Sequence, residues 1–122
     1  MYTALVLDAD SRKFLREGLQ GLPDGWDIKC HHMTVNMGPA ASGPAAALLG
    51  HEFNIEAVAL GTDRRVMAVS VETNCPSVNS TKHITVAVNV AGGGKPKHSN
   101  EIKDWKPLNK KISLKGVVQE VQ

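Results

Sequence analysis

The chain has 122 residues, of which 42% are hydrophobic and 21% are charged, and its net charge is +2. This length and composition predict one globular domain over residues 1–122 and exclude a disordered tail or a collagen-like chain. No apolar stretch is long enough to span a membrane, and the first residues do not resemble a secretory leader. The two cysteines are too few for a disulfide framework. We therefore expect a reduced, cytoplasmic protein without a membrane partner.

The hydrophobic pattern predicts short helices between strands. Six strands are predicted, at residues 2–8, 26–37, 53–61, 64–72, 82–90 and 112–121. Three short helices are predicted: one capped by Asp10 or Ser11 with Phe14, Leu15 and Leu19 on its apolar side, one over residues 44–49, and one capped by Ser99 or Asn100 that leads into Trp105. The expected fold class is α+β, with mostly antiparallel strands.

Two matching tetrapeptides lie in separate predicted strands. They are His32-Met33-Thr34-Val35 and His83-Ile84-Thr85-Val86, and each reads His, apolar, Thr, Val. Because side chains alternate along a strand, the His and Thr of each copy are expected on one face. By the same alternation His31 falls on the face opposite His32, and we interpret it as a structural or surface residue.

The two His-Thr pairs suit chemistry at a phosphodiester. Histidine can give or take a proton near neutral pH, and a threonine hydroxyl can donate a hydrogen bond to a phosphate oxygen. If the two pairs face each other across a groove, one imidazole can deprotonate the nucleophile while the other protonates the leaving oxygen. This arrangement requires no metal ion and no other cofactor.

The paired motifs resemble those of the two-histidine (2H) phosphoesterase superfamily, which includes RNA 2′,3′-cyclic phosphodiesterases and the cyclic phosphodiesterase domain of fungal tRNA ligases. The resemblance implies a bilobal, pseudo-symmetric fold in which each lobe brings one motif strand to a central cleft. The short spacing between the motifs would make this chain a compact member. Residues 95–101, Lys-Pro-Lys-His-Ser-Asn-Glu, are also similar to a segment of the tRNA-ligase type.

The resemblance also implies roles for individual residues. His32 and His83 would be catalytic, with His83 as the base that activates water and His32 as the acid, and Thr34 and Thr85 would bind the phosphate. The implied activity is hydrolysis of a 2′,3′-cyclic phosphate at an RNA 3′ end or on a small nucleotide. A close alternative within the same superfamily is cleavage of a cyclic oligonucleotide second messenger, as in phage counter-defence enzymes.

Positive charge is concentrated near the C-terminus. Residues 95–122 carry seven lysines and three acidic residues, which suits a nucleotide or RNA partner. Lys95 and Lys97 follow a Gly-Gly-Gly loop and are candidates to reach the substrate phosphates. The alternative to an enzyme is therefore a non-catalytic module that binds RNA or a nucleotide. The lysines could also form a solvated surface that binds no ligand. No protein partner is inferred.

A metal site is the remaining alternative. Cys30 and Cys75 could join His32 and His83, but these four residues lack the close ligand spacing that is typical of structural zinc sites.

Overall fold

The computed structural model describes all residues, 1–122, as seven strands, one α-helix and two short 3₁₀ helices. In chain order the elements are β1 (Tyr2–Leu7), α1 (Ala9–Gly18), β2 (Asp27–Ile28), β3 (His32–Met37), η1 (Ala40–Ser42), β4 (Glu52–Thr62), β5 (Val66–Glu72), β6 (His83–Val88), η2 (Pro96–Glu101) and β7 (Trp105–Val121). None of the helices is long and apolar enough to cross a membrane.

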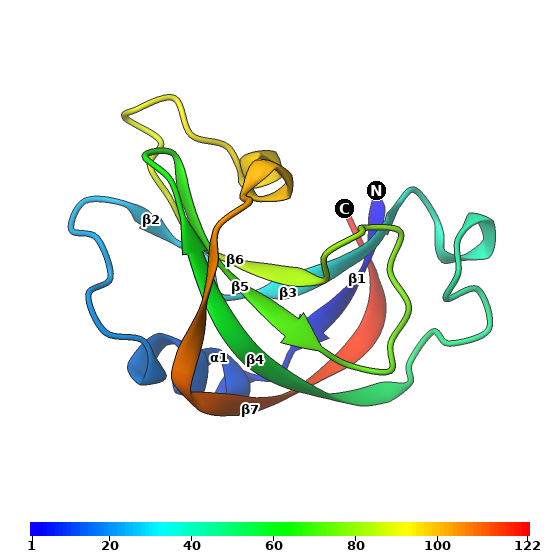
Figure 1. Ribbon diagram of the computed structural model, residues 1–122. Coiled ribbons are helices and arrows are strands. Elements are labelled where there is room, and N and C mark those ends of the chain that lie inside the picture. Colours follow the sequence, from blue (N-terminus) through cyan, green and yellow to red (C-terminus); the bar gives the residue numbers. More distant parts are fainter.

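Six of the strands close into a barrel. They follow the order β6-β3-β1-β7-β4-β5, and β5 pairs back onto β6, while the two-residue β2 extends the sheet beside β6. Every pairing is antiparallel. The expected α+β class with mostly antiparallel strands is confirmed. Because the barrel is closed, no long strand edge is left unpaired. Closure of the barrel also brings β3 next to β6, although a long chain segment separates these two strands (Figure 1).

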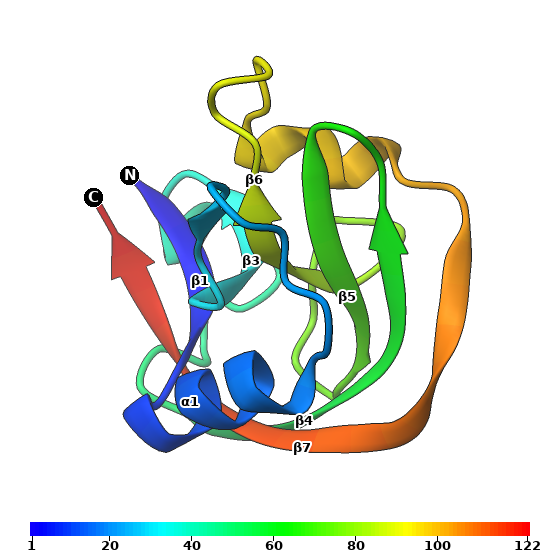
Figure 2. The same ribbon diagram turned by 90° about the vertical axis from the view of Figure 1, so that its left-hand side faces the viewer.

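The inside of the barrel holds the hydrophobic core. Side chains that point inward from the strands are fully buried and include Leu5, Met33, Val69, Ile84 and Val118. The helix α1 lies across one end of the barrel, against β7, and adds the buried Leu15 to this core (Figure 2).

The helix begins earlier than the sequence predicts. Asp8 is its N-cap, because the carboxylate of Asp8 accepts a hydrogen bond of 2.8 Å from the Ser11 amide. The Ser11 hydroxyl in turn accepts a hydrogen bond of 2.8 Å from the Lys115 amide of β7. Phe14, expected on the apolar side, is 55% exposed, because it lies about 100° around the helix from the buried Leu15.

The predicted strand over residues 26–37 is broken into β2 and β3. Cys30 has a φ of 47°, which a residue other than glycine adopts only rarely. Asp27 pairs with Val88 and Met33 pairs with Ile84. The five residues between Asp27 and Met33 therefore lie opposite three residues of β6, and two extra residues bulge out. This bulge ends the regular alternation of side chains between Ile28 and His32.

Three other predicted elements are also misplaced. The helix expected to begin at Ser99 or Asn100 is the 3₁₀ helix η2, which begins at Pro96 and ends before Trp105. Residues 44–49 form turns rather than a helix, and η1 precedes them at Ala40–Ser42. The last strand begins at Trp105, not at residue 112. Ala57 of β4 pairs with Ile112 and Ala59 pairs with Pro107, so residues 108–111 bulge and hide the alternation that would have revealed the early part of β7.

The contact between β3 and β6 gives a first prediction. Ile84 is fully buried beneath the paired motif strands, so Ile84→Ala should lower the free energy of unfolding by about 2–5 kcal/mol, and Ile84→Val by about 0.5–1.5 kcal/mol. Urea denaturation measures both. The control is Val90→Ala, because Val90 is 63% exposed and its truncation should cost less than about 0.5 kcal/mol. Equal losses at the two positions would contradict the described core.

Candidate active site

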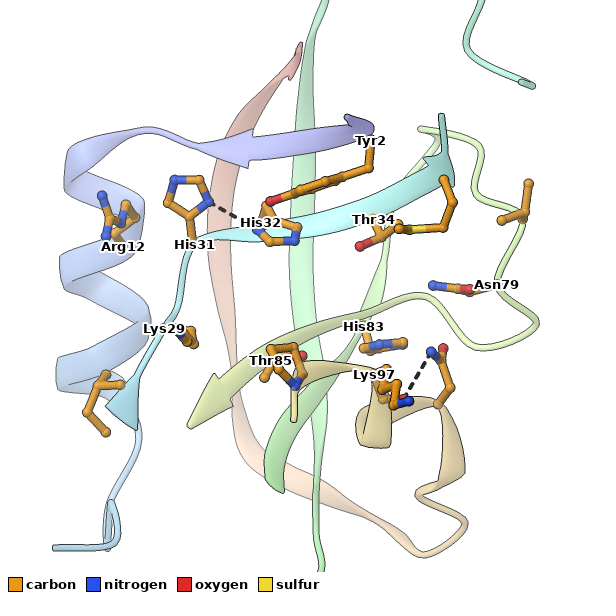
Figure 3. A pocket seen from close by; sticks show the side chains of 15 residues that line it. Tyr2, Arg12, Lys29, His31, His32, Thr34, Asn79, His83, Thr85 and Lys97 are labelled. Carbon is orange, nitrogen blue, oxygen red and sulfur yellow. Dashed lines mark hydrogen bonds between the residues drawn. The ribbon is translucent and has the colours of Figure 1, made fainter. Parts of the chain in front are cut away.

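The four motif side chains line one cavity of about 590 Å³ on the outer face of the barrel. They lie there because Met33 and Ile84, the residues between them, point inward to the core. The cavity walls come from β1, α1, the β2–β3 connection, β3, β6, the loop before β6, and η2 (Figure 3). Its lining residues are Tyr2, Arg12, Ile28, Lys29, His31, His32, Thr34, Met37, Val78, Asn79, His83, Thr85, Pro96, Lys97 and Asn100.

The antiparallel register sets how the two motifs meet. Because Met33 pairs with Ile84, His32 lies across from Thr85, and Thr34 lies across from His83. Figure 3 shows this arrangement, with His32 and Thr34 on one strand and Thr85 and His83 on its neighbour. Each histidine therefore faces the hydroxyl of the other motif, and the two pairs are related by an approximate two-fold axis.

The hydrogen bond of His83 fixes which ring nitrogen carries its proton. Nδ1 of His83 lies 2.8 Å from the carbonyl oxygen of Thr81. A carbonyl oxygen only accepts hydrogen bonds, so Nδ1 holds a hydrogen and, in the neutral ring, Nε2 holds the lone pair. This tautomer leaves Nε2 of His83 as a proton acceptor. The residue is 8% exposed and lines the cavity.

His32 is held by two aromatic neighbours. Its Nδ1 lies 3.0 Å from Nδ1 of His31, so one of these two nitrogens donates a hydrogen bond to the other. The ring of Tyr2 packs on its other side, with the ring centroids 5.2 Å apart. When His31 donates, Nε2 of His32 carries a hydrogen and can donate it to a ligand.

The surroundings of His32 oppose its protonation. Burial, followed by the nearby charges of His31 and His83, lowers the pKa of His32 to about 4. Burial and the Arg12 guanidinium also lower the pKa of His31. The His31–His32 pair is therefore neutral at pH 7 in the absence of a ligand, and a bound anion would favour a proton on it.

His31 and Arg12 are site residues that the sequence interpretation missed. The strict alternation placed His31 on the opposite face, but the left-handed Cys30 breaks the strand and turns His31 toward the same cavity as His32. Arg12 comes from α1, which no motif connects with the histidines. The positive φ at Cys30 has no signature in the sequence, so the pattern alone could not reveal this.

Serines hold both motif strands in place. Thr85 Oγ1 lies 2.8 Å from the hydroxyl of Ser99, which is 1% exposed in η2. The Ser77 hydroxyl donates a hydrogen bond of 2.8 Å to the Thr34 carbonyl. The segment over residues 95–101 thus acts in part as a support for Thr85.

The two candidate lysines differ in position. Lys97 lines the cavity beside His83 (Figure 3), whereas Lys95 is exposed and lies outside the lining. The lining contains Arg12, Lys29 and Lys97 but no aspartate or glutamate, so its fixed charges are all positive. A cavity of this charge favours an anionic ligand.

The four residues considered for a metal site do not form a common ligand set. The Cys30 thiol lies 3.8 Å from the Val86 carbonyl and the Cys75 thiol 3.6 Å from the Pro76 carbonyl. No group of three or more His, Cys, Asp and Glu side chains lies in a geometry that could hold a metal ion.

Comparison with protein-family models, with curated proteins and with solved structures finds no match for this chain.

The low pKa of His32 gives a second prediction. In the unfolded chain this ring titrates near pH 6.5, so between about pH 6.5 and 4 the unfolded state binds more protons than the folded state. Stability should therefore decrease as the pH falls through this window, and His32→Asn should weaken this dependence. NMR titration of the His32 ring should give a midpoint near 4. A midpoint near 6.5 would contradict the described burial.

Proposed function

We propose that this protein is a metal-independent phosphodiesterase that hydrolyses a 2′,3′-cyclic phosphate at an RNA 3′ end or on a nucleotide. The observation that carries the proposal is that two His-Thr pairs face each other head to tail across one cavity that has no acidic lining residue. This geometry supplies one base, one acid and two hydroxyl donors around a single anion.

The base in this reaction is His83. Its Nε2, left unprotonated by the Nδ1 hydrogen bond to Thr81, takes a proton from a water molecule. The water oxygen then attacks phosphorus, and the bond from phosphorus to the 2′ or 3′ oxygen breaks. His32 gives its Nε2 proton to the departing oxygen, so a phosphomonoester and a free hydroxyl are formed. Exchange with solvent returns each ring to its starting state.

The two threonines hold the phosphate during this reaction. Thr34 and Thr85 donate hydrogen bonds to the non-bridging oxygens, and Ser99 orients the Thr85 hydroxyl. Lys97 adds positive charge beside His83. Binding of the anionic substrate also raises the proton affinity of His32, because its negative charge opposes the burial that keeps the free ring neutral. Substrate binding thus favours the protonated form of His32, the acid of the proposed reaction.

The same proposal includes membership of the two-histidine phosphoesterase superfamily and its two-lobed symmetry. The approximate two-fold relation between the motifs at Met33 and Ile84 supports it. One half would be β1, α1 and β3, and the other half β4, β5 and β6, joined within the closed barrel.

A non-catalytic binding module is less well supported. It relied on the lysines of residues 95–122, but of these only Lys97 lines the cavity. Lys111 instead lies 4.0 Å from Glu56 and 3.7 Å from Glu72 on the surface formed by β4, β5 and β7.

Turnover provides the third prediction. Wild-type protein should hydrolyse a nucleoside 2′,3′-cyclic phosphate in the presence of EDTA, with a bell-shaped pH profile. His32→Ala and His83→Ala should each lower kcat by about 10²- to 10⁴-fold, because each removes one proton-transfer group. The matched control is His51→Ala, since His51 is exposed and outside the cavity. Circular dichroism checks that every variant is folded.

Three outcomes of this experiment would contradict the proposal. They are loss of activity with EDTA, an equal loss in His51→Ala, and no turnover by folded wild-type protein. If wild-type protein cleaves 3′,5′-linked cyclic dinucleotides but not the 2′,3′-cyclic phosphate, second-messenger cleavage replaces this function. If nucleotide binds without turnover and His32→Ala binds equally well, the protein is a binding module.

The threonine hydroxyls give a fourth prediction. Thr85→Val keeps the shape of the side chain but removes its donor, and a hydrogen bond to a charged group is worth about 1.5–3 kcal/mol, so kcat/KM should decrease about 10- to 100-fold. Thr85→Ser should retain activity. Steady-state kinetics measures both, and full activity in Thr85→Val would remove this residue from the phosphate site.

A further inference from the structure

The cavity extends past the motif residues toward α1. Arg12 of α1 and Lys29 of the β2–β3 connection both line it. Figure 3 shows both on one side of His32, while Asn79 lies on the other side. The cavity is therefore longer than the space around the two histidines, and its α1 end carries positive charge.

Arg12 has no protein partner for its charge. Its Nε is buried and makes no hydrogen bond, and its guanidinium takes part in no ion pair. Arg65, in contrast, lies 3.2 Å from Asp63 and 3.7 Å from Glu101. Lys29 is already engaged with Asp27 at 2.7 Å, so Arg12 is the unneutralised cation at this end. A guanidinium binds the oxygens of a phosphate through two parallel hydrogen bonds.

The opposite end of the cavity carries two exposed apolar side chains. Met37 and Val78 line it next to Asn79 and are 77% and 60% exposed. The Val78 amide donates a hydrogen bond of 2.8 Å to the Val35 carbonyl, which holds this loop beside the end of β3. Apolar side chains at the rim of a polar cavity suit the face of a nucleobase.

The cationic, motif and apolar side chains of the cavity are arranged in this order along the direction of β3. Arg12 lies near His31, which directly precedes the strand, as the lowered pKa of His31 also indicates. His32 and Thr34 come next, and Met37 ends the strand about 20 Å from His31 at the usual rise per residue. The phosphate held by the two motifs would thus have a cationic subsite on one side and an apolar subsite on the other.

We propose that Arg12 binds a second phosphate of the substrate, the one on the 5′ side of its terminal nucleotide. This inference rests on the proposed function and specifies its substrate: an RNA 3′ end with at least one internucleotide phosphate, rather than a free nucleoside cyclic phosphate. The terminal base points toward Met37 and Val78, and the remaining RNA leaves the cavity past α1.

Binding tests this subsite without turnover. Adenosine 3′-phosphate and adenosine 3′,5′-bisphosphate differ only in the 5′-phosphate, and isothermal titration calorimetry gives both affinities. Wild-type protein should bind the bisphosphate about tenfold more tightly, and Arg12→Gln should abolish this difference. Arg16→Gln should preserve it, because Arg16 lies one turn further along α1, exposed and outside the cavity. A dinucleotide 3′-phosphate should bind at least as tightly as the bisphosphate.

Several results would overturn the inference. Equal affinities in wild-type protein, a preference that persists in Arg12→Gln, or an equal weakening of both ligands would each remove the subsite. Weaker binding of the dinucleotide than of the bisphosphate would indicate a site for a terminal 5′-phosphate instead of an RNA chain. If the Arg12-dependent preference holds but no cyclic phosphate is hydrolysed, the hydrolase proposal fails while the subsite remains.

Discussion

The pairing of β3 with β6 at Met33 and Ile84 is the constraint on which the site depends. Both residues are fully buried, so the register cannot slip by one position without moving a core side chain to the surface and a polar one inward. The neighbours of each buried residue must then project from the other face. One antiparallel contact thus aligns two His-Thr pairs from distant parts of the chain into a single cavity. Closure of the barrel supplies this contact, because it makes β6 the neighbour of both β3 and β5.

The electrostatics of the cavity follow from the same packing. His32 is enclosed by Tyr2 and His31, and burial is the main cause of its pKa of about 4. The site without ligand therefore combines a neutral His31–His32 pair with fixed positive charges, chiefly that of Arg12. Such a site gains most from binding an anion, since the anion both neutralises the cations and favours a proton on His32, the proposed acid.

The sequence predicted those parts of the structure that depend on local periodicity. The strands beginning at Tyr2 and His83 and the hairpin of β4 and β5 follow from their side-chain patterns. The pattern failed where the backbone departs from a regular strand. The positive φ of Cys30 turned His31 into the cavity, and the bulge over residues 108–111 hid the first part of β7. Arg12 could not be predicted, because its place in the site follows only from how α1 packs on the barrel.

The proposed mechanism requires two imidazoles, one from each motif, to act on a single phosphate. Long-range ¹⁵N–¹H NMR can follow both histidine rings with and without a nucleoside 2′,3′-cyclic vanadate, which mimics five-coordinate phosphorus. In the free protein at pH 7 the His32 ring should be neutral, and the spectrum should show the hydrogen of His83 on Nδ1. On binding, His32 should gain a proton and Nε2 of both rings should shift. Unchanged His32 and His83 resonances, with the ligand bound, would contradict it.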